Sequence, residues 1–103
     1  MKRTLTALAA LAALFAGSNA MANADLAKAK NCMACHATDK KVVGPAYKDV
    51  AAKYAKDKDA AAKLADKILK GGSGAWGPVP MPPNTQVTPD EAKKLAAWVL
   101  TVK

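Results

Sequence analysis

The sequence has few of the side chains on which most metal and catalytic sites depend. Its 103 residues contain one histidine and two cysteines, and a structural zinc site takes about four protein ligands. After the first 22 residues, no segment alternates apolar and polar residues in the way that predicts a half-buried strand. No nucleic-acid-binding motif is present either. These absences favour a helical protein with one small, specialised site.

The three scarce side chains stand together in Cys32-Met33-Ala34-Cys35-His36. C-x-x-C-H is the spacing of covalent haem attachment, in which each thiol adds to one vinyl group. Two intervening residues allow the backbone to turn, so that both sulfurs face one edge of the porphyrin. The next residue can then place an imidazole nitrogen on the iron. We therefore predict one haem c held by Cys32 and Cys35, with His36 as an axial ligand.

A bare C-x-x-C also occurs in thiol redox pairs, zinc half-sites and disulfides. A redox pair of the thioredoxin type opens a helix after a strand, and no strand pattern precedes Cys32. No second C-x-x-C is present to complete a zinc site. A disulfide would give His36 no role. Haem attachment is the interpretation that uses all three side chains.

Residues 1–22 have the pattern of a secretory signal peptide. Two basic residues precede an apolar run over residues 5–16, and small residues follow. The run is shorter than the roughly 20 residues of a spanning helix, and an uncleaved membrane anchor is the alternative. Cleavage is predicted after Ala22 or Ala24, which leaves a domain at 23–103 in the oxidising periplasm, with no integral membrane segment after processing.

Basic residues outnumber acidic ones. The net charge of the chain is +8, and loss of Lys2 and Arg3 with the signal lowers it by two, to +6. A basic surface suits docking on an acidic protein partner or on an anionic membrane surface. Nucleic acid is disfavoured by the missing motif and by the export signal. A surface that only confers solubility is the remaining alternative.

Four helical segments are expected from alanine- and lysine-rich stretches with helical spacing: 25–31, 46–55, 59–70 and 88–103. Tyr47 and Tyr54 share one face of the second, a pattern more typical of core packing than of a redox relay. Thr88, followed by Pro89 at N1 and Glu91 at N3, predicts a capping box at the start of the last helix.

Residues 71–87 contain four glycines and four prolines, and we expect a rigid loop there without regular structure. Such a loop can present the Met81 sulfur to the open face of the haem. Met33 lies between the cysteines on the attachment edge and is poorly placed for that role. His/Met ligation raises the reduction potential, because a soft thioether favours ferrous iron. Core packing and simple exposure are the alternatives for Met81.

The dipeptide Gly44-Pro45 is a turn signal shortly after the haem motif. The Pro45 carbonyl is placed to accept a hydrogen bond from the unligated nitrogen of His36, which would fix the orientation of the ring. A plain chain turn is the alternative reading of Pro45.

Four segments resemble the bacterial class I c-type cytochromes, in particular the small cytochrome c-551 (c8) group. They are the Cys32–His36 motif, Val43–Ala51, Trp76–Asn84 and Ala97–Leu100. The resemblance covers residues 26–103. It implies an all-α, small class I cytochrome c fold, with about four helices around one covalently bound haem.

The resemblance also implies roles for individual residues. The Asn84 amide is expected to donate a hydrogen bond to the sulfur of Met81, which is the second axial ligand. The Trp76 indole N–H is expected to donate to a haem propionate. Lys67 stands where family members often carry an arginine near a propionate, and it matches that residue by charge only.

The function implied by the resemblance is a periplasmic, monohaem electron carrier rather than an enzyme. Electrons would come from a bc1-type complex or another cytochrome and pass to a terminal reductase such as nitrite reductase or cytochrome oxidase. Filled axial positions would keep substrates from the iron. A small peroxidase or gas sensor is disfavoured, because His36 is the only histidine. The partners are expected to be redox proteins with acidic docking surfaces, and the protein a monomer.

Overall fold

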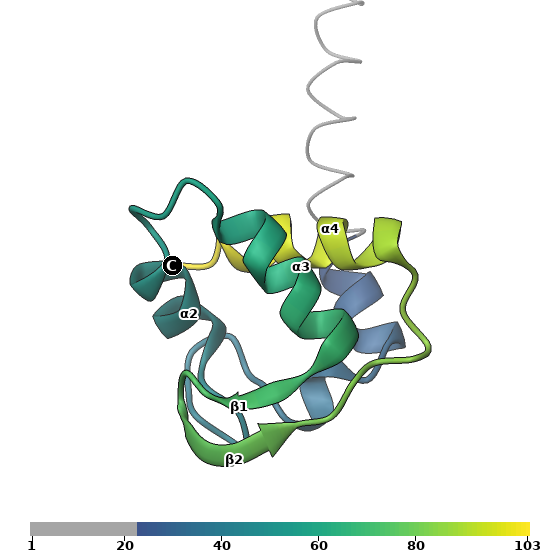
Figure 1. The fold of residues 1–103 in the computed structure, drawn as a ribbon, viewed down its shortest axis with the longest axis horizontal. Coiled ribbons are helices and arrows are strands. Elements are labelled where there is room, and N and C mark those ends of the chain that lie inside the picture. The colour runs from purple at the N-terminus through teal and green to yellow at the C-terminus, as the bar shows by residue number, and fades with distance from the viewer. Residues whose placement is uncertain (1–22) are drawn as a thin grey trace, which may run out of the picture.

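Helix α4 (Pro89–Val99) is the element against which α2 and α3 pack (Figure 1). The computed structural model describes residues 23–103, and the predicted export signal in residues 1–22 lies outside them. In chain order the described elements before α4 are a helical segment at 23–29, η1 (Cys32–Ala34), α2 (Tyr47–Lys53), α3 (Ala60–Lys70), β1 (Gly72–Gly74) and β2 (Gly77–Met81). The regular elements of the described chain are thus helices and one short hairpin.

The start of α4 is fixed by the predicted capping box. The backbone N–H of Glu91 donates to Thr88 Oγ1 at 3.2 Å, and the N–H of Thr88 donates to Glu91 Oε1 at 3.0 Å. Pro89 occupies the first turn, where its missing N–H leaves no donor unpaired. Two of the free N–H groups at the helix start are thereby satisfied, and the helix direction is set from its first turn.

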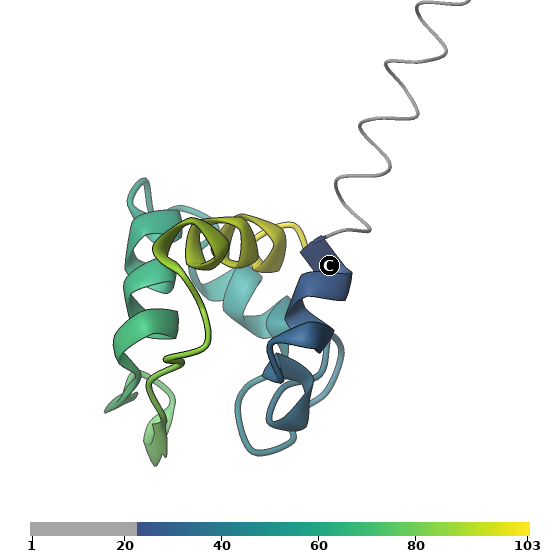
Figure 2. The same cartoon turned by 90° about the vertical axis from the view of Figure 1, so that its right-hand side faces the viewer.

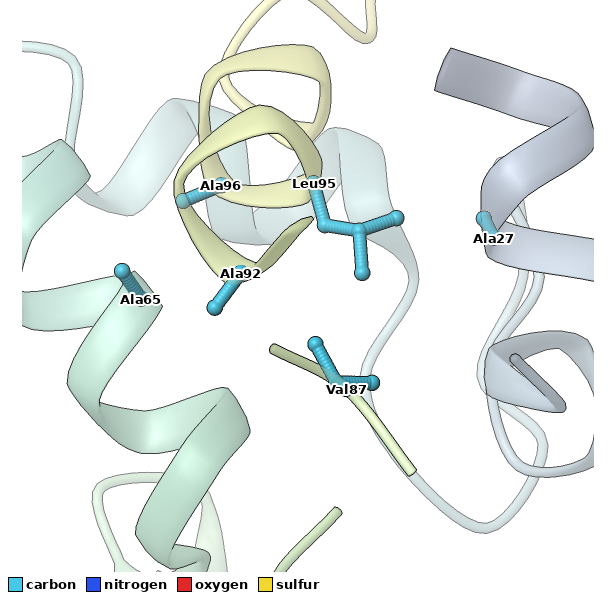
Figure 3. Packing of buried hydrophobic residues seen from close by; sticks show 6 residues of the cluster. All are labelled: Ala27, Ala65, Val87, Ala92, Leu95 and Ala96. Atoms are coloured by element: carbon cyan, nitrogen blue, oxygen red, sulfur yellow. The ribbon is translucent and has the colours of Figure 1, made fainter. Parts of the chain in front are cut away.

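The hydrophobic core is made mostly of small side chains. One cluster joins Ala27, Ala65, Val87, Ala92, Leu95 and Ala96. Figure 3 shows Ala65 of α3 facing Ala92 and Ala96 on one side of α4, while Leu95 extends toward Ala27 on the other. Among the described residues Leu95 is the largest side chain that is fully buried. Such a core buries little apolar area for a domain of this size, so further apolar contact is needed for stability.

A second cluster lies where α2 meets α4. Tyr47, Val50 and Val99 are buried there, and Tyr54 packs at its margin. The ring of Tyr47 meets that of Trp98 edge to face, with centroids 5.5 Å apart. The prediction of core packing is therefore confirmed for Tyr47, whereas Tyr54 follows α2 and is only partly buried against this cluster.

Helix α4 ends earlier than its sequence predicts. We expected it to continue to Lys103, but it ends at Val99. Thr101 causes this, because its N–H and its hydroxyl both donate to the Trp98 carbonyl, at 2.9 and 2.6 Å. These bonds satisfy the last turn in a tighter geometry and release the final two residues from the helix.

The expectation of no regular structure over residues 71–87 was wrong, because β1 and β2 form an antiparallel hairpin there. The paired residues are Gly72 with Met81 and Gly74 with Gly77. Residues 78–80 of β2 therefore oppose Ser73 alone, which makes an irregular, bulged ladder. Both prolines of β2 lie in this bulge, where a missing N–H is tolerated.

Two limbs extend from the same side of α4 (Figure 2). One consists of the 23–29 helix, η1 and the loop after it, and the other consists of α3 and the hairpin. The Cys32–His36 motif therefore belongs to one limb and Met81 to the other. Within residues 23–103 no helix is both long and apolar enough to cross a membrane.

Candidate haem site

The two cysteines lie on a single turn of 3₁₀-helix. Asn31 precedes η1 in the left-handed conformation, with φ of 66°, and turns the chain out of the preceding helix. The N–H of Cys35 then donates to the Cys32 carbonyl at 3.2 Å. Residues three apart on a 3₁₀-helix lie above one another. Cys32 and Cys35 are therefore on the same side of the turn, as attachment to one porphyrin edge requires.

Both thiols are half-buried and are not joined in a disulfide. Burial raises the pKa of the Cys32 thiol, and a hydrogen bond with Tyr47 only partly opposes that shift. Burial also raises the pKa of Tyr47, and the adjacent Cys32 adds to the effect. Before haem is attached, these groups are therefore a neutral thiol and a neutral phenol at neutral pH.

His36 is held by its surroundings in one orientation. Its Nδ1 lies 2.8 Å from the Pro45 carbonyl oxygen. That oxygen can only accept, so Nδ1 carries the proton of the neutral ring and Nε2 keeps the lone pair. The ring stacks on Tyr47, with centroids 4.8 Å apart and an interplanar angle of 18°. Nε2 is the nitrogen left for a metal.

Gly44 packs directly against the His36 ring. A Cβ at this position would lie 2.8 Å from Nδ1 and 2.9 Å from Nε2, and nearer still to Cε1. The N–H of Gly44 also donates to the Cys35 carbonyl at 2.7 Å. The loop that supplies the Pro45 carbonyl is therefore anchored to the haem motif at a position where no side chain fits.

Met81 ends β2 on the opposite limb and is half-buried. Its backbone pairs with Gly72 and also crosses close to Gly71, which ends α3 with φ of 69°. A Cβ on Gly71 would meet the Met81 carbonyl oxygen and would lie 2.8 Å from both the Pro82 carbonyl carbon and the Pro83 nitrogen. The end of α3 thus fixes the path of the chain around Met81.

The hairpin tip is attached to α2 by a lysine. Trp76 stands in the turn between the strands and is 44 % exposed. Lys53 Nζ lies 4.6 Å from the centroid of its ring and donates to the Ala75 carbonyl at 2.8 Å. Lys67 Nζ, from α3, lies beside Gly72 of β1. Sequence reasoning missed Lys53, because nothing in its spacing separates it from the other helical lysines.

Asn84 is hydrogen-bonded to the end of α3. Its Nδ2 donates to the Ile68 carbonyl at 2.9 Å, and its backbone N–H donates to the same oxygen at 3.2 Å. Its Oδ1 accepts from Gln86 Nε2 at 3.1 Å. The predicted hydrogen bond from Asn84 to the Met81 sulfur stays a prediction, and Gln86 was not anticipated from the sequence.

The donor set fits a covalently bound haem. It comprises two thiols on one turn, one imidazole with Nε2 uncommitted, and a thioether on the facing limb. Half-buried apolar side chains border the same core and would supply contact for a large apolar ring: Leu64, Ile68, Leu69, Met33 and Trp98. Residues 23–103 contain no cluster of three His, Cys, Asp or Glu side chains that could hold another metal ion.

Comparison with known families decides the identity of the fold. The cytochrome c family profile matches residues 20–103. The chain belongs to the cytochrome c family. It is a small class I c-type cytochrome, as its sequence predicted, and its cofactor is a covalently attached haem c. It is a monohaem electron carrier and not an enzyme.

Several relatives are similar to this cytochrome over most of their length. Cytochrome c-552 of Nitrosomonas europaea is 54 % identical over 103 residues, which cover 100 % of both chains. Cytochrome c-551 of Pseudomonas aeruginosa is 60 % identical over 78 residues, covering 76 % of this chain and 74 % of the relative. The crystal structure of wild-type Nitrosomonas europaea cytochrome c552 has a TM-score of 0.76 at 61 % identity, over 78 % of this chain and 99 % of that one.

Proposed function

We propose that Cys32 and Cys35 attach the haem and that His36 and Met81 bind its iron from opposite sides. The observation that carries the assignment is the contact between His36 Nδ1 and the Pro45 carbonyl at 2.8 Å. This contact commits one ring nitrogen to the protein and leaves Nε2 free, on the residue that follows Cys35. In haem proteins and other metal sites, a bond of this type orients the ligand and raises its basicity.

The residues of this chain would hold and tune the group rather than react with a substrate. When bound, the haem supplies an iron centre that takes up and gives back one electron. Met81, whose backbone pairs with Gly72, would supply the second protein ligand to the iron and would keep substrates from the metal. Asn84 retains one Nδ2 hydrogen beyond its bond to Ile68, which we assign to the Met81 sulfur.

Two further residues are proposed to face the haem propionates. The Trp76 indole N–H and the Lys67 ammonium group lie on or beside the hairpin of the Met81 limb. Both groups can only donate hydrogen bonds, and the propionates are anionic acceptors. Their interaction would lower the cost of burying carboxylates next to the ring.

We further propose that the protein works in the periplasm as a monomer. The signal pattern of residues 1–22 supports export, and cleavage after Ala22 or Ala24 would release the domain. The electron donor would be a bc1-type complex or another cytochrome, and the acceptor a terminal reductase such as nitrite reductase or cytochrome oxidase. The excess of lysines favours partners with acidic docking surfaces.

Visible absorption spectra of the purified protein, oxidised and reduced, with and without carbon monoxide, test the ligand assignment. We expect a low-spin c-type spectrum, a methionine–ferric charge-transfer band, and no change on adding carbon monoxide. Rapid carbon monoxide binding would overturn the assignment of a second protein ligand.

The variant Met81→Ala then tests which residue is that ligand. We expect it to bind carbon monoxide, to lose the charge-transfer band and to have a lower reduction potential, because the thioether that favours ferrous iron is gone. An unchanged potential would remove Met81 from the ligand set. Met33→Ala is the matched control, and its charge-transfer band should persist.

A further inference from the structure

Gln86 makes three hydrogen bonds with residues that precede it in the sequence. Two are with Lys30, 56 residues earlier, and one is with Asn84, two residues earlier. Its Nε2 donates to the Lys30 carbonyl at 2.9 Å and to Asn84 Oδ1 at 3.1 Å. The backbone carbonyl of Gln86 accepts a hydrogen bond from Lys30 Nζ at 3.1 Å. Lys30 directly follows the 23–29 helix, at a helix end where carbonyl groups lack partners within the helix. Gln86 therefore satisfies that helix end and contacts Asn84 at the same time.

Only one orientation of the Gln86 and Asn84 side-chain amides gives every contact in this network both a donor and an acceptor. The Lys30 carbonyl accepts, so the Gln86 amide must turn its nitrogen toward it and toward Asn84. Asn84 must then offer Oδ1 to Gln86, which turns Nδ2 toward the Ile68 carbonyl at 2.9 Å. A flipped Asn84 amide would place nitrogen against nitrogen at one end and oxygen against oxygen at the other.

The network also spans the two sides of the haem site. Lys30 precedes Cys32 on the limb that carries His36, while Asn84 follows Met81 on the other limb. The ion pair of Lys30 Nζ with Glu91 Oε2, at 3.4 Å, connects the same point to the first turn of α4. The exposed Gln86 side chain thus links the segment that precedes the cysteines to the segment that follows Met81.

We propose that Gln86 is a positioning residue for the second axial ligand. It fixes the orientation of the Asn84 amide and holds the segment after Met81 against the end of the first helical segment. Lys30, Asn84 and Gln86 form the hydrogen-bonded network on which this proposal rests. The inference rests on the proposed function, because its consequence for the iron passes through Met81.

The test compares Gln86→Ala with Thr85→Ala in the haem-loaded protein. Thr85 is the adjacent exposed residue, and its side chain makes no hydrogen bond within the described residues. The first readout is NMR hydrogen exchange of the Asn84 backbone N–H. The second is the pH midpoint at which the methionine–ferric charge-transfer band disappears on alkaline titration. Gln86→Glu keeps the side-chain size and removes both N–H donors, so it serves as a second variant.

Gln86→Ala removes two hydrogen bonds of Nε2, of which one reaches Asn84. We expect roughly fivefold faster exchange at Asn84 and a roughly fivefold larger population without Met81 on the iron, the usual effect of losing that one bond. The second change lowers the titration midpoint by about 0.7 pH unit. Gln86→Glu should shift both readouts in the same direction, and Thr85→Ala should leave both at wild-type values.

Unchanged Asn84 exchange in Gln86→Ala would overturn the proposal, whatever the band does. Faster exchange, or a lower unfolding midpoint, with an unchanged band midpoint would also overturn it, because Gln86 would then serve stability alone. If the wild-type protein shows no charge-transfer band, the assignment of Met81 fails. The exchange comparison would then decide by itself whether Gln86 orients Asn84.

Discussion

Gly44→Ala is expected to displace the His36 ring or the loop that packs on it. The added Cβ would lie 2.8 Å from Nδ1 and 2.9 Å from Nε2, where a relaxed contact needs at least about 3.4 Å. The His36 ring cannot move away from the added Cβ without losing a contact, because Tyr47 stacks on the ring and the Pro45 carbonyl is hydrogen-bonded to Nδ1. Either the hydrogen bond or the loop must give way.

The expected cost follows from these two contacts. Overpacking a well-filled site costs about 1–3 kcal/mol, and a lost hydrogen bond costs about 0.5–1.5 kcal/mol. We therefore expect Gly44→Ala to lower the free energy of unfolding by about 2–4 kcal/mol. In a domain of this size that loss corresponds to a thermal midpoint lower by at least about 8 °C.

Thermal and guanidinium unfolding of the haem-loaded protein measure the effect, and the reduction potential reports the ligand. Displacement of His36 should change the potential as well as the stability. Val43→Ala is the control, because that neighbouring side chain is exposed and should alter the unfolding free energy by no more than about 0.5 kcal/mol. A Gly44→Ala protein with wild-type stability and wild-type potential would refute the packing of Gly44 on the His36 ring.

Three further predictions concern the surface of the domain. Lys53→Met removes the cation over Trp76 while keeping an apolar stem, and should lower the unfolding free energy by about 0.5–1 kcal/mol; Lys56→Met, measured in parallel, should have no effect. The hydrogen bond from the Thr88 N–H lowers the pKa of Glu91 in the folded protein. The ionised carboxylate therefore stabilises the fold at pH values above the ordinary pKa of glutamate, and this stabilisation is lost as the pH falls through the lowered pKa of the folded state. Glu91→Gln should therefore be less stable than wild type at neutral pH, and the two unfolding curves should converge at acid pH; a difference that persists there would contradict this explanation. Electron transfer to an acidic redox protein should slow as salt is added, because salt screens the attraction that brings the partners together; stopped-flow rates independent of ionic strength would exclude a role for the lysines.

The sequence was most informative where a local pattern determines the structure. Thr88, Pro89 and Glu91 supply every group of a capping box, and the structure forms it. The i, i+3, i+7 spacing of α2 identified its buried face, since Tyr47 and Val50 are in the core. These features depend on neighbours within one helical turn, so sequence alone contains the information.

Features that depend on distant partners were missed. The hairpin contains one β-branched residue, Val79, and its prolines lie in a bulge, so the usual signs of a strand are lacking. The contacts of Lys53 with Trp76 and of Gln86 with Lys30 each join separate segments, and neither pairing follows from local spacing. The orientation of His36 was anticipated from Pro45, whereas the close approach of Gly44 became visible only in three dimensions.

The bulge in β2 has a consequence for how the molecule meets other proteins. An exposed strand with a complete row of N–H and C=O groups is a template on which a strand from another chain can add. Here Pro78 and Pro80 remove two of the five N–H groups of β2, and Val79 between them is 62 % exposed. The strand is also short and irregular, so a foreign backbone has no continuous ladder to join. Contacts on this side must be made by side chains, which separate more readily than a shared sheet and suit a carrier that has to leave each partner after a single encounter.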